Sequence, residues 1–203
     1  MPDDVTIANM AIDEFGGNPV TSVTEVDADS KESEVIVRWY AHVRDLVLYD
    51  FPWNFATERL AFGAANATAP QFGYTFSHPL PSNPWVLRVL RLEEVEDAFV
   101  VRGRAMFSDV SSPKADAIVR VTDAGIYSPP FVEALRMRLE AAIAYPVTRS
   151  TELRTSSLQI YNAFIDDLKG ADSQEGTPDE EPEPSLLTVR RGFESPLFGS
   201  NVD

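Results

Sequence analysis

Apolar side chains recur every three or four positions near both ends of the chain, a spacing typical of amphipathic helices. Residues 5–12 show this pattern first, and residues 35–51 show it most strongly. Residues 131–145 and 151–168 repeat it, and Gly170 is predicted to end the last helix. Pro52 ends the second helix, and the pattern predicts a further short helix over residues 53–60.

Between residues 62 and 122 the pattern changes to short runs in which apolar and polar residues alternate, as in half-buried β-strands. One run carries aromatic residues at 72, 74 and 76. Further strand candidates lie at 86–92, 99–102, 105–107 and 117–121. Gly103 is predicted to form a turn or bulge. Glycines and prolines separate the runs, so we expect a small, largely antiparallel β module.

These patterns together predict an α+β fold. Residues 1–61 and 123–169 are expected to form an α-helical bundle, with residues 62–122 as a mostly antiparallel β module inserted into it. Residues 170–184 are expected to be a linker, followed by an extended C-terminal docking tail over 185–203. The total length of 203 residues is typical of one domain, or of one domain with an insertion.

The acidic residues are concentrated at the ends of the chain. Lys and Arg number 17 and Asp and Glu number 32, which gives a net charge of −15. Residues 1–37 hold nine acids and one base, and residues 170–184 hold six acids and no base. This balance argues against sequence-independent binding of nucleic acid. The acidic ends fit a solvating role or a binding role, and charge patterning alone leaves both open.

The chain offers little material for catalysis. It has no Cys and two His, so it lacks a thiol nucleophile and most ligands of a zinc site. No phosphate-binding glycine loop, nucleophile elbow or zinc-protease motif occurs in it. His42 and His78 are expected to be structural, and the adjacent carboxylate pairs to be solvated. The sequence therefore predicts a protein that is not an enzyme and that needs no cofactor or metal.

Targeting signals are also missing from the sequence pattern. No apolar run approaches the roughly 20 residues that span a bilayer. Residues 1–4 are acidic, where a signal peptide begins with basic residues. These features favour an intracellular protein that does not interact with membranes.

The C-terminal segment has an unusual composition. Residues 170–184 are acidic and contain three prolines, so they cannot bury a core, yet the residues after them are largely apolar. An apolar segment on a charged linker is typical of a sequence that docks on a partner. The residues expected to make the contact are Leu186, Leu187, Arg190, Phe193 and Phe198. The alternative is that the segment returns to its own domain.

A second unusual feature follows the strongest predicted helix. Pro52, Trp53, Asn54 and Phe55 come directly after Phe51, so three large aromatic residues surround a helix-ending proline. Aromatic residues so close together favour a packed corner over an exposed loop. We therefore expect Trp53 and Phe55 to lie in the core or in an interface between subunits.

Several motifs together resemble one known family. The longest reads Trp39-Tyr40-x-x-x-Arg44-Asp45-x-x-Leu48 and continues as Pro52-Trp53-Asn54-Phe55-Ala56. The others are Phe15-Gly16-Gly17-Asn18-Pro19-Val20, Gly73-Tyr74-x-Phe76-x-x-Pro79-Leu80-Pro81, Leu87-Arg88-Val89-Leu90 and Phe131-x-x-Ala134-Leu135-x-x-Arg138-Leu139. Across residues 5–169 the chain resembles the tail tubular protein A, or head-to-tail adaptor, family of short-tailed double-stranded DNA phages. It departs from that family at Ser82-Asn83-Pro84-Trp85 and by the missing Trp in 185–190.

The resemblance implies a structural protein of the virion, assembled in the host cytoplasm and located in the neck of the phage tail. Copies of the chain would form a twelve-fold ring that joins the portal protein to the tail nozzle, a tubular protein B-like partner, or to tail fibre proteins. Viral DNA would pass through the lumen of the ring without sequence-specific binding. The C-terminal tail, with Arg190 at the position of the family's arginine, would dock on the portal.

Two other classes of function remain open from the sequence. One is a small hydrolase with an unrecognised carboxylate site. The other is a small acidic binding or regulatory module that mimics nucleic acid and has no catalytic activity.

Overall fold

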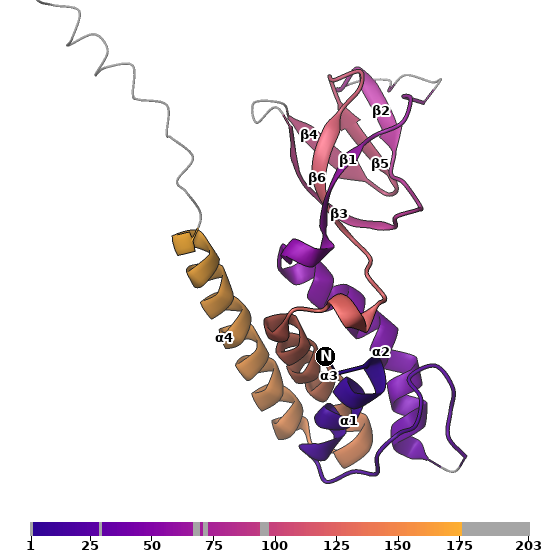
Figure 1. Cartoon of the computed structure of the whole chain (residues 1–203), viewed down its shortest axis with the longest axis vertical. Coiled ribbons are helices and arrows are strands. Elements are labelled where there is room, and N and C mark those ends of the chain that lie inside the picture. Colours follow the sequence, from indigo (N-terminus) through magenta and orange to yellow (C-terminus); the bar gives the residue numbers. More distant parts are fainter. Residues whose placement is uncertain (1, 29, 67–69, 71–72, 94–97, 176–203) are drawn as a thin grey trace, which may run out of the picture. The chain divides into compact units, whose positions relative to one another are not determined.

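The computed structural model describes residues 2–28, 30–66, 70, 73–93 and 98–175, and their fold is mixed α+β (Figure 1). The described residues fall into two units, one within residues 1–167 and one that begins at residue 168. The helices are α1 (Asp4–Asp13), α2 (Lys31–Asp50), α3 (Pro129–Thr148) and α4 (Thr151–Glu175), with short 3-10 turns η1 (Asn54–Ala56) and η2 (Ala124–Ile126). The strands are β1 (Thr57–Ala61), β2 (Phe76–Pro79), β3 (Val86–Leu92), β4 (Phe99–Arg102), β5 (Ala105–Ser108) and β6 (Lys114–Val119).

The first two helices begin at side-chain caps. The Asp3 carboxylate accepts the backbone N–H of Thr6 at 2.8 Å and starts α1, and the Ser30 hydroxyl accepts that of Ser33 at 3.2 Å and starts α2. Both helices pack on α3, so the predicted apolar faces meet in one core. The fully buried residues of this helical core are Ile7, Ala8, Ala11, Ile12, Ile36, Val47, Leu48, Phe131, Ala134, Leu135, Leu139, Ile143 and Ala144.

The last two helices run further than the sequence pattern predicts. Pro146 lies inside α3, which ends at Arg149 in a left-handed conformation (φ 63°). A proline near the end of a helix removes only one backbone hydrogen bond, so α3 continues for two residues beyond it. The predicted end of α4 at Gly170 is wrong, because the helix continues to Glu175. A helical glycine costs about 1 kcal/mol relative to alanine, which does not stop an established helix.

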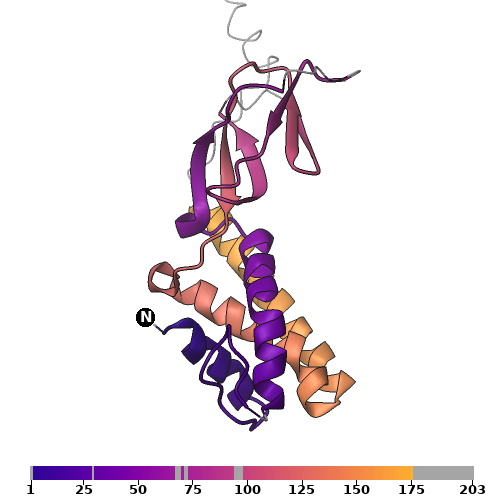
Figure 2. The same cartoon turned by 90° about the vertical axis from the view of Figure 1, so that its right-hand side faces the viewer.

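Among the residues that the structure describes between α2 and α3, six strands form two antiparallel sheets of three strands, in the orders β1-β6-β3 and β2-β5-β4. A two-residue turn with Gly103 at φ 60° joins β4 to β5, which confirms the turn predicted there. Side chains of both sheets share one apolar cluster: Met106 of β5 packs with Val86 of β3 and Ala117 of β6. The strands lie beyond the C-terminal end of α2, which contacts β3 and β6 (Figure 2).

The helix predicted over residues 53–60 is wrong. This segment forms η1 and then β1, and β1 pairs along its whole length with β6, from Thr57 opposite Ile118 to Ala61 opposite Lys114. A helix of eight residues is unstable by itself, whereas pairing with β6 satisfies the backbone groups of this segment. Residues 57–61, assigned to the helical bundle from the sequence, are therefore paired with the β region.

The other strand boundaries differ by a few residues. The strand predicted from the aromatic residues at 72, 74 and 76 begins only at Phe76, because Gly73 has a φ of 92°, which a strand does not accommodate. Residue 72 lies outside the described residues. The strands predicted at 86–92 and 99–102 match β3 and β4, while β6 begins three residues before the predicted position 117.

Candidate functional site

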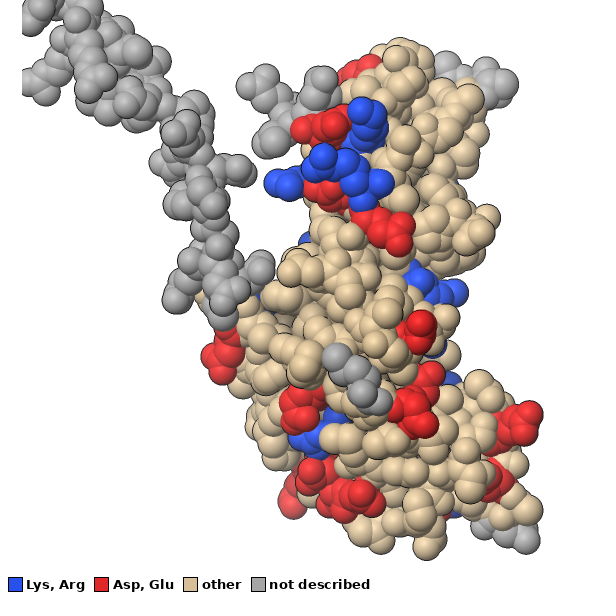
Figure 3. Space-filling model, viewed as in Figure 1, with Lys and Arg blue, Asp and Glu red and all other residues tan. Residues whose placement is uncertain are grey.

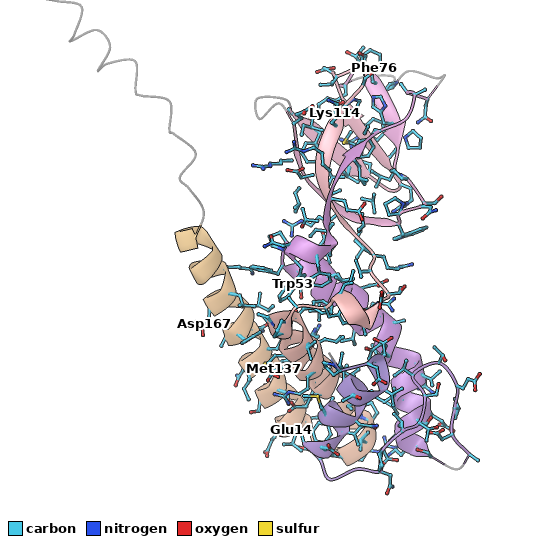
Figure 4. The ribbon with its side chains drawn as sticks, in the orientation of Figure 1. Glu14, Trp53, Phe76, Lys114, Met137 and Asp167 are labelled. Carbon is cyan, nitrogen blue, oxygen red and sulfur yellow. The ribbon has the colours of Figure 1, made fainter. Side chains whose placement is uncertain are left out.

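The segment between α2 and β1 packs with two aromatic residues near the start of α3 in a cluster that we call the aromatic corner (Phe51, Trp53, Phe55, Tyr127 and Phe131). Trp53 is 3% exposed and its ring lies 4.8 Å from that of Phe51 and 5.2 Å, edge-on, from that of Phe131. Phe55 lies 5.0 Å from Phe131 and 5.7 Å from Tyr127. The Trp53 indole N–H donates to the carbonyl oxygen of Val47 at 2.8 Å, which fixes the indole against α2 (Figure 4).

The structure places the four residues of the predicted corner differently. Trp53 is buried, Pro52 and Phe55 are half-buried, and Asn54 is exposed at the start of η1. Tyr127 directly follows η2 and Phe131 lies at the start of α3, so the cluster joins the chain that enters the β region to the chain that leaves it. The burial of Tyr127 raises the pKa of its phenol, and its hydroxyl donates to Val121 at 3.3 Å.

Basic residues attach the strands to the end of α2. Arg120, just after β6, forms a salt bridge with Asp45 of α2. Arg88 of β3 donates to the carbonyl oxygen of Tyr49 at 3.2 Å and stacks over its ring. The Trp85 ring contacts two guanidinium groups, those of Arg104 at 4.0 Å and Arg120 at 5.2 Å. These contacts position the β3–β6 end of the sheet against the helix.

Buried tyrosines connect the helices through carboxylates. The hydroxyl of Tyr40 on α2 donates to Asp4 of α1 at 2.7 Å, and that of Tyr161 on α4 donates to Asp50 of α2 at 2.8 Å. Burial, and then the hydrogen bond to the carboxylate, raise the pKa of both phenols above the ordinary value of about 10. Both tyrosines therefore stay protonated donors at neutral pH.

The outer face of the β1-β6-β3 sheet carries a row of charges that crosses three strands. Asp116 lies between Arg59 and Arg91, whose Nε atoms donate to its two oxygens at 3.2 and 2.9 Å. The hydrogen bond from Arg91, followed by that from Arg59, lowers the pKa of Asp116. Asp116 is 17% exposed, and the arginines are 62% and 59% exposed. On the face in Figure 3, basic and acidic side chains lie next to one another over this sheet, whereas acidic ones predominate over the helices.

Neither histidine has a catalytic setting. His78 is fully buried in the β region, and its two ring nitrogens lie 3.0 and 3.1 Å from the carbonyl oxygens of Gly63 and Val110. His42 is exposed on α2, and its ring lies 6.0 Å from that of Trp39. Within the described ranges, no cluster of three or more potential metal ligands occurs. The helices that the structure describes include none long and apolar enough to cross a membrane.

The predicted docking residues Leu186, Leu187, Arg190, Phe193 and Phe198 lie outside the described residues. The structure instead reveals exposed apolar side chains on α3 and α4, namely Tyr145, Leu153 and Ile160. Between residues 151 and 170, only Ser157, Tyr161 and Ile165 of α4 are buried. The apolar spacing along residues 151–168 predicts the apolar stripe of α4, but it does not indicate how few residues of that stripe are buried.

No family model matches the sequence, and no curated protein matches it.

Proposed function

We propose that this chain is a structural virion protein, a head-to-tail adaptor of a short-tailed double-stranded DNA phage. Its fold is that of a helical bundle with an inserted β module and an extended C-terminal tail. Twelve copies form a ring between the portal protein and the tail nozzle, or tail fibre proteins, and the ring lines the conduit for DNA ejection. The protein acts by assembly in the virion tail and has no catalytic step.

The observation that carries the proposal is the aromatic corner. Pro52–Ala56 is the most specific part of the resemblance, and Trp53 and Phe55 connect α2, β1 and the start of α3. The resemblance implies a ring built on the helical part, with the β module reaching towards tail proteins. A motif that organises the connection between these two parts supports that architecture.

Surface chemistry also supports assembly with other copies. Leu153 and Ile160 on α4 are 44% and 53% exposed, and because they are seven residues apart they lie on the same side of the helix. Large exposed apolar side chains that share one face are typical of protein–protein contacts. We assign this side of the helix, the α4 face (Leu153 and Ile160), to contacts between copies.

The charge of the chain suits a DNA conduit. A net charge of −15 does not favour binding to phosphates, so DNA can slide past such a surface without being held. The same acidity is the feature that would suit a nucleic-acid mimic, which would act as a monomer bound to a basic partner.

The test is assembly of the purified full-length chain with the portal. Native mass spectrometry and negative-stain images are expected to show twelve copies as a ring on the portal. A chain that stays monomeric and ignores the portal, but binds a basic protein in a fixed ratio, would contradict the proposal and favour the mimic.

A matched pair of variants sharpens the test. Ile160→Glu places a charge on the α4 face without disturbing the core, because Ile160 is exposed. Gln159→Glu introduces the same residue one position away, outside that face. Ring formation is expected to fail for the first variant and to persist for the second, while circular dichroism stays unchanged for both. Equal assembly of both variants would contradict the assignment of this face.

A further inference from the structure

An apolar groove of about 270 Å³ lies between α2, α3 and the beginning of α4. Its walls are mainly aliphatic and aromatic, and its two charged residues are both arginines, Arg138 and Arg154. The full lining is Trp39, Val43, Leu46, Arg138, Ala141, Ala142, Tyr145, Pro146, Arg154 and Leu158. A ligand that fits this groove combines large apolar side chains with nearby negative charge.

Arg138 is only partly satisfied by its own surroundings. Its guanidinium stacks over the Tyr161 ring at 5.4 Å, but its buried Nε has no hydrogen-bond partner among the described residues. A buried N–H without an acceptor is unfavourable, so an acceptor supplied from outside would stabilise it. Arg154 is exposed at the other wall. Both arginines therefore favour an acidic occupant.

The chain itself contains a segment with this chemistry. Residues 170–184 carry six acids and no base, and residues 185–203 add apolar residues such as Leu187, Phe193 and Phe198. We propose that the groove binds the C-terminal segment 185–203 of a second copy of this chain. In this arrangement its apolar side chains fill the groove, while the acidic residues that precede it lie near Arg138 and Arg154.

The length of chain beyond the described residues is sufficient for such an exchange. Residues 176–203, when extended at about 3.3 Å per residue, reach roughly 90 Å. A compact domain of 167 residues has a radius of gyration of about 15 Å, so the segment can reach a groove on a neighbouring copy. The inference rests on the proposed function only in requiring that copies assemble, because assembly raises the local concentration of neighbouring segments.

Disulfide trapping in the full-length chain tests this contact. The chain contains no cysteine, so Ala142→Cys in the groove and Phe193→Cys in the segment introduce two thiols per chain, and each single variant oxidised alone measures the links between like positions of two copies. Mild oxidation is expected to link separate chains into dimers and longer ladders. The matched control combines Phe193→Cys with Ala163→Cys, an exposed alanine of α4 outside the groove, and is expected to link much less.

A charge variant tests the role of the arginines. Arg154→Glu should lower the yield of linked chains about fivefold, as reversing one exposed charge contact does, and added salt should lower the wild-type yield. Arg38→Glu, an equal change at an exposed position of α2 outside the groove, should leave the yield unchanged. A synthetic peptide of residues 185–203 should compete with the link.

Three results would overturn the inference: equal linking in the groove and control pairs, links found only within single chains, or no effect of the competing peptide. Native mass spectrometry of the same samples separates this failure from failure of the proposed function. A ring that forms without groove links rejects only the occupant of the groove, whereas absence of any ring rejects the adaptor assignment.

Discussion

The helical region and the β region of this protein are packed by different means. The helical core combines small residues such as Ala134 and Ala144 with large ones, and one end of it is a cluster of aromatic rings around the fully buried Phe131. The apolar cluster of the β region is mostly aliphatic, and the fully buried His78 has both ring nitrogens within hydrogen-bond distance of backbone carbonyl oxygens. Among the described residues each region buries three polar side chains, so the two regions differ in aromatic packing and in the buried histidine rather than in the number of polar groups that they enclose.

The largest effect is expected from removing a ring at the centre of the aromatic corner. Phe131 contacts the rings of Trp53, Phe55 and Tyr127 at 4.6 to 5.2 Å and is fully buried. Phe131→Ala should lower the free energy of unfolding by about 3–5 kcal/mol because it leaves a cavity. Urea unfolding measures it, and Phe55→Ala is the comparison. Since Phe55 is half-buried, Phe55→Ala should lower the free energy of unfolding by less than Phe131→Ala does. An equal decrease for the two variants would contradict this ranking.

A substitution at His78 should be felt mainly in the β region. Replacing His78 with Leu keeps the volume but removes the contacts to the carbonyl oxygens of Gly63 and Val110, which should cost about 2 kcal/mol. Amide hydrogen exchange is expected to rise in β2 and β5 while α2 and α3 stay protected. If exchange rises equally in the helices, the two regions unfold as one unit and the comparison fails.

Loss of the Tyr161 hydroxyl should weaken the attachment of α4. Tyr161→Phe removes a hydrogen bond to the carboxylate of Asp50, and the free energy of unfolding should fall by about 1.5 kcal/mol. Because the folded pKa of Tyr161 is raised, the stabilisation is complete below the unfolded value of about 10 and is lost as the pH rises through the folded value. The difference between wild type and variant should therefore shrink only in strongly alkaline solution.

The smallest effect is expected on the exposed sheet. Asp116→Asn should cost about 0.5–1 kcal/mol, since Arg59 and Arg91 are largely exposed. The folded pKa of Asp116 is lowered, so its contribution is complete above the unfolded value of about 4 and disappears as the pH falls through the folded value. Denaturation at neutral and acidic pH checks this, with Glu58→Gln on the same sheet as the control. A difference that persists in acid would rule out the ion pairs as its cause.

Local sequence patterns predicted the elements whose stability is decided locally. The segments 5–12, 35–51 and 131–145 lie in α1, α2 and α3, apart from residue 51, because one apolar face repeats along each. The segment 57–61 was assigned wrongly because its strand conformation depends on β6, which follows more than fifty residues later. A pattern within eight residues holds no information about such a distant partner.

Contacts between distant positions were likewise beyond sequence reasoning. The aromatic corner was recognised at residues 52–55, but its other half, Tyr127 and Phe131, comes from a different part of the chain. Arg59 and Asp116, and Tyr161 and Asp50, meet for the same reason. In β3, irregular pairing with β6 buries every third residue, so Arg88 and Arg91 are both exposed in a strand where alternation would place them on opposite faces.

The aromatic corner also makes the β region a segment of the chain that can be replaced as a whole. The chain enters the strands after Phe55 and returns from them at Tyr127, and these two rings lie only 5.7 Å apart. Each ring lies a few ångströms from its own backbone, so the two backbone ends are further apart than the rings but still close, and a short linker at up to about 3.5 Å per residue is expected to join them. Conversely, a foreign domain whose own termini lie close together can be inserted at this point while the packing of the helices stays the same. The helical region can therefore carry different inserted domains in place of the β region.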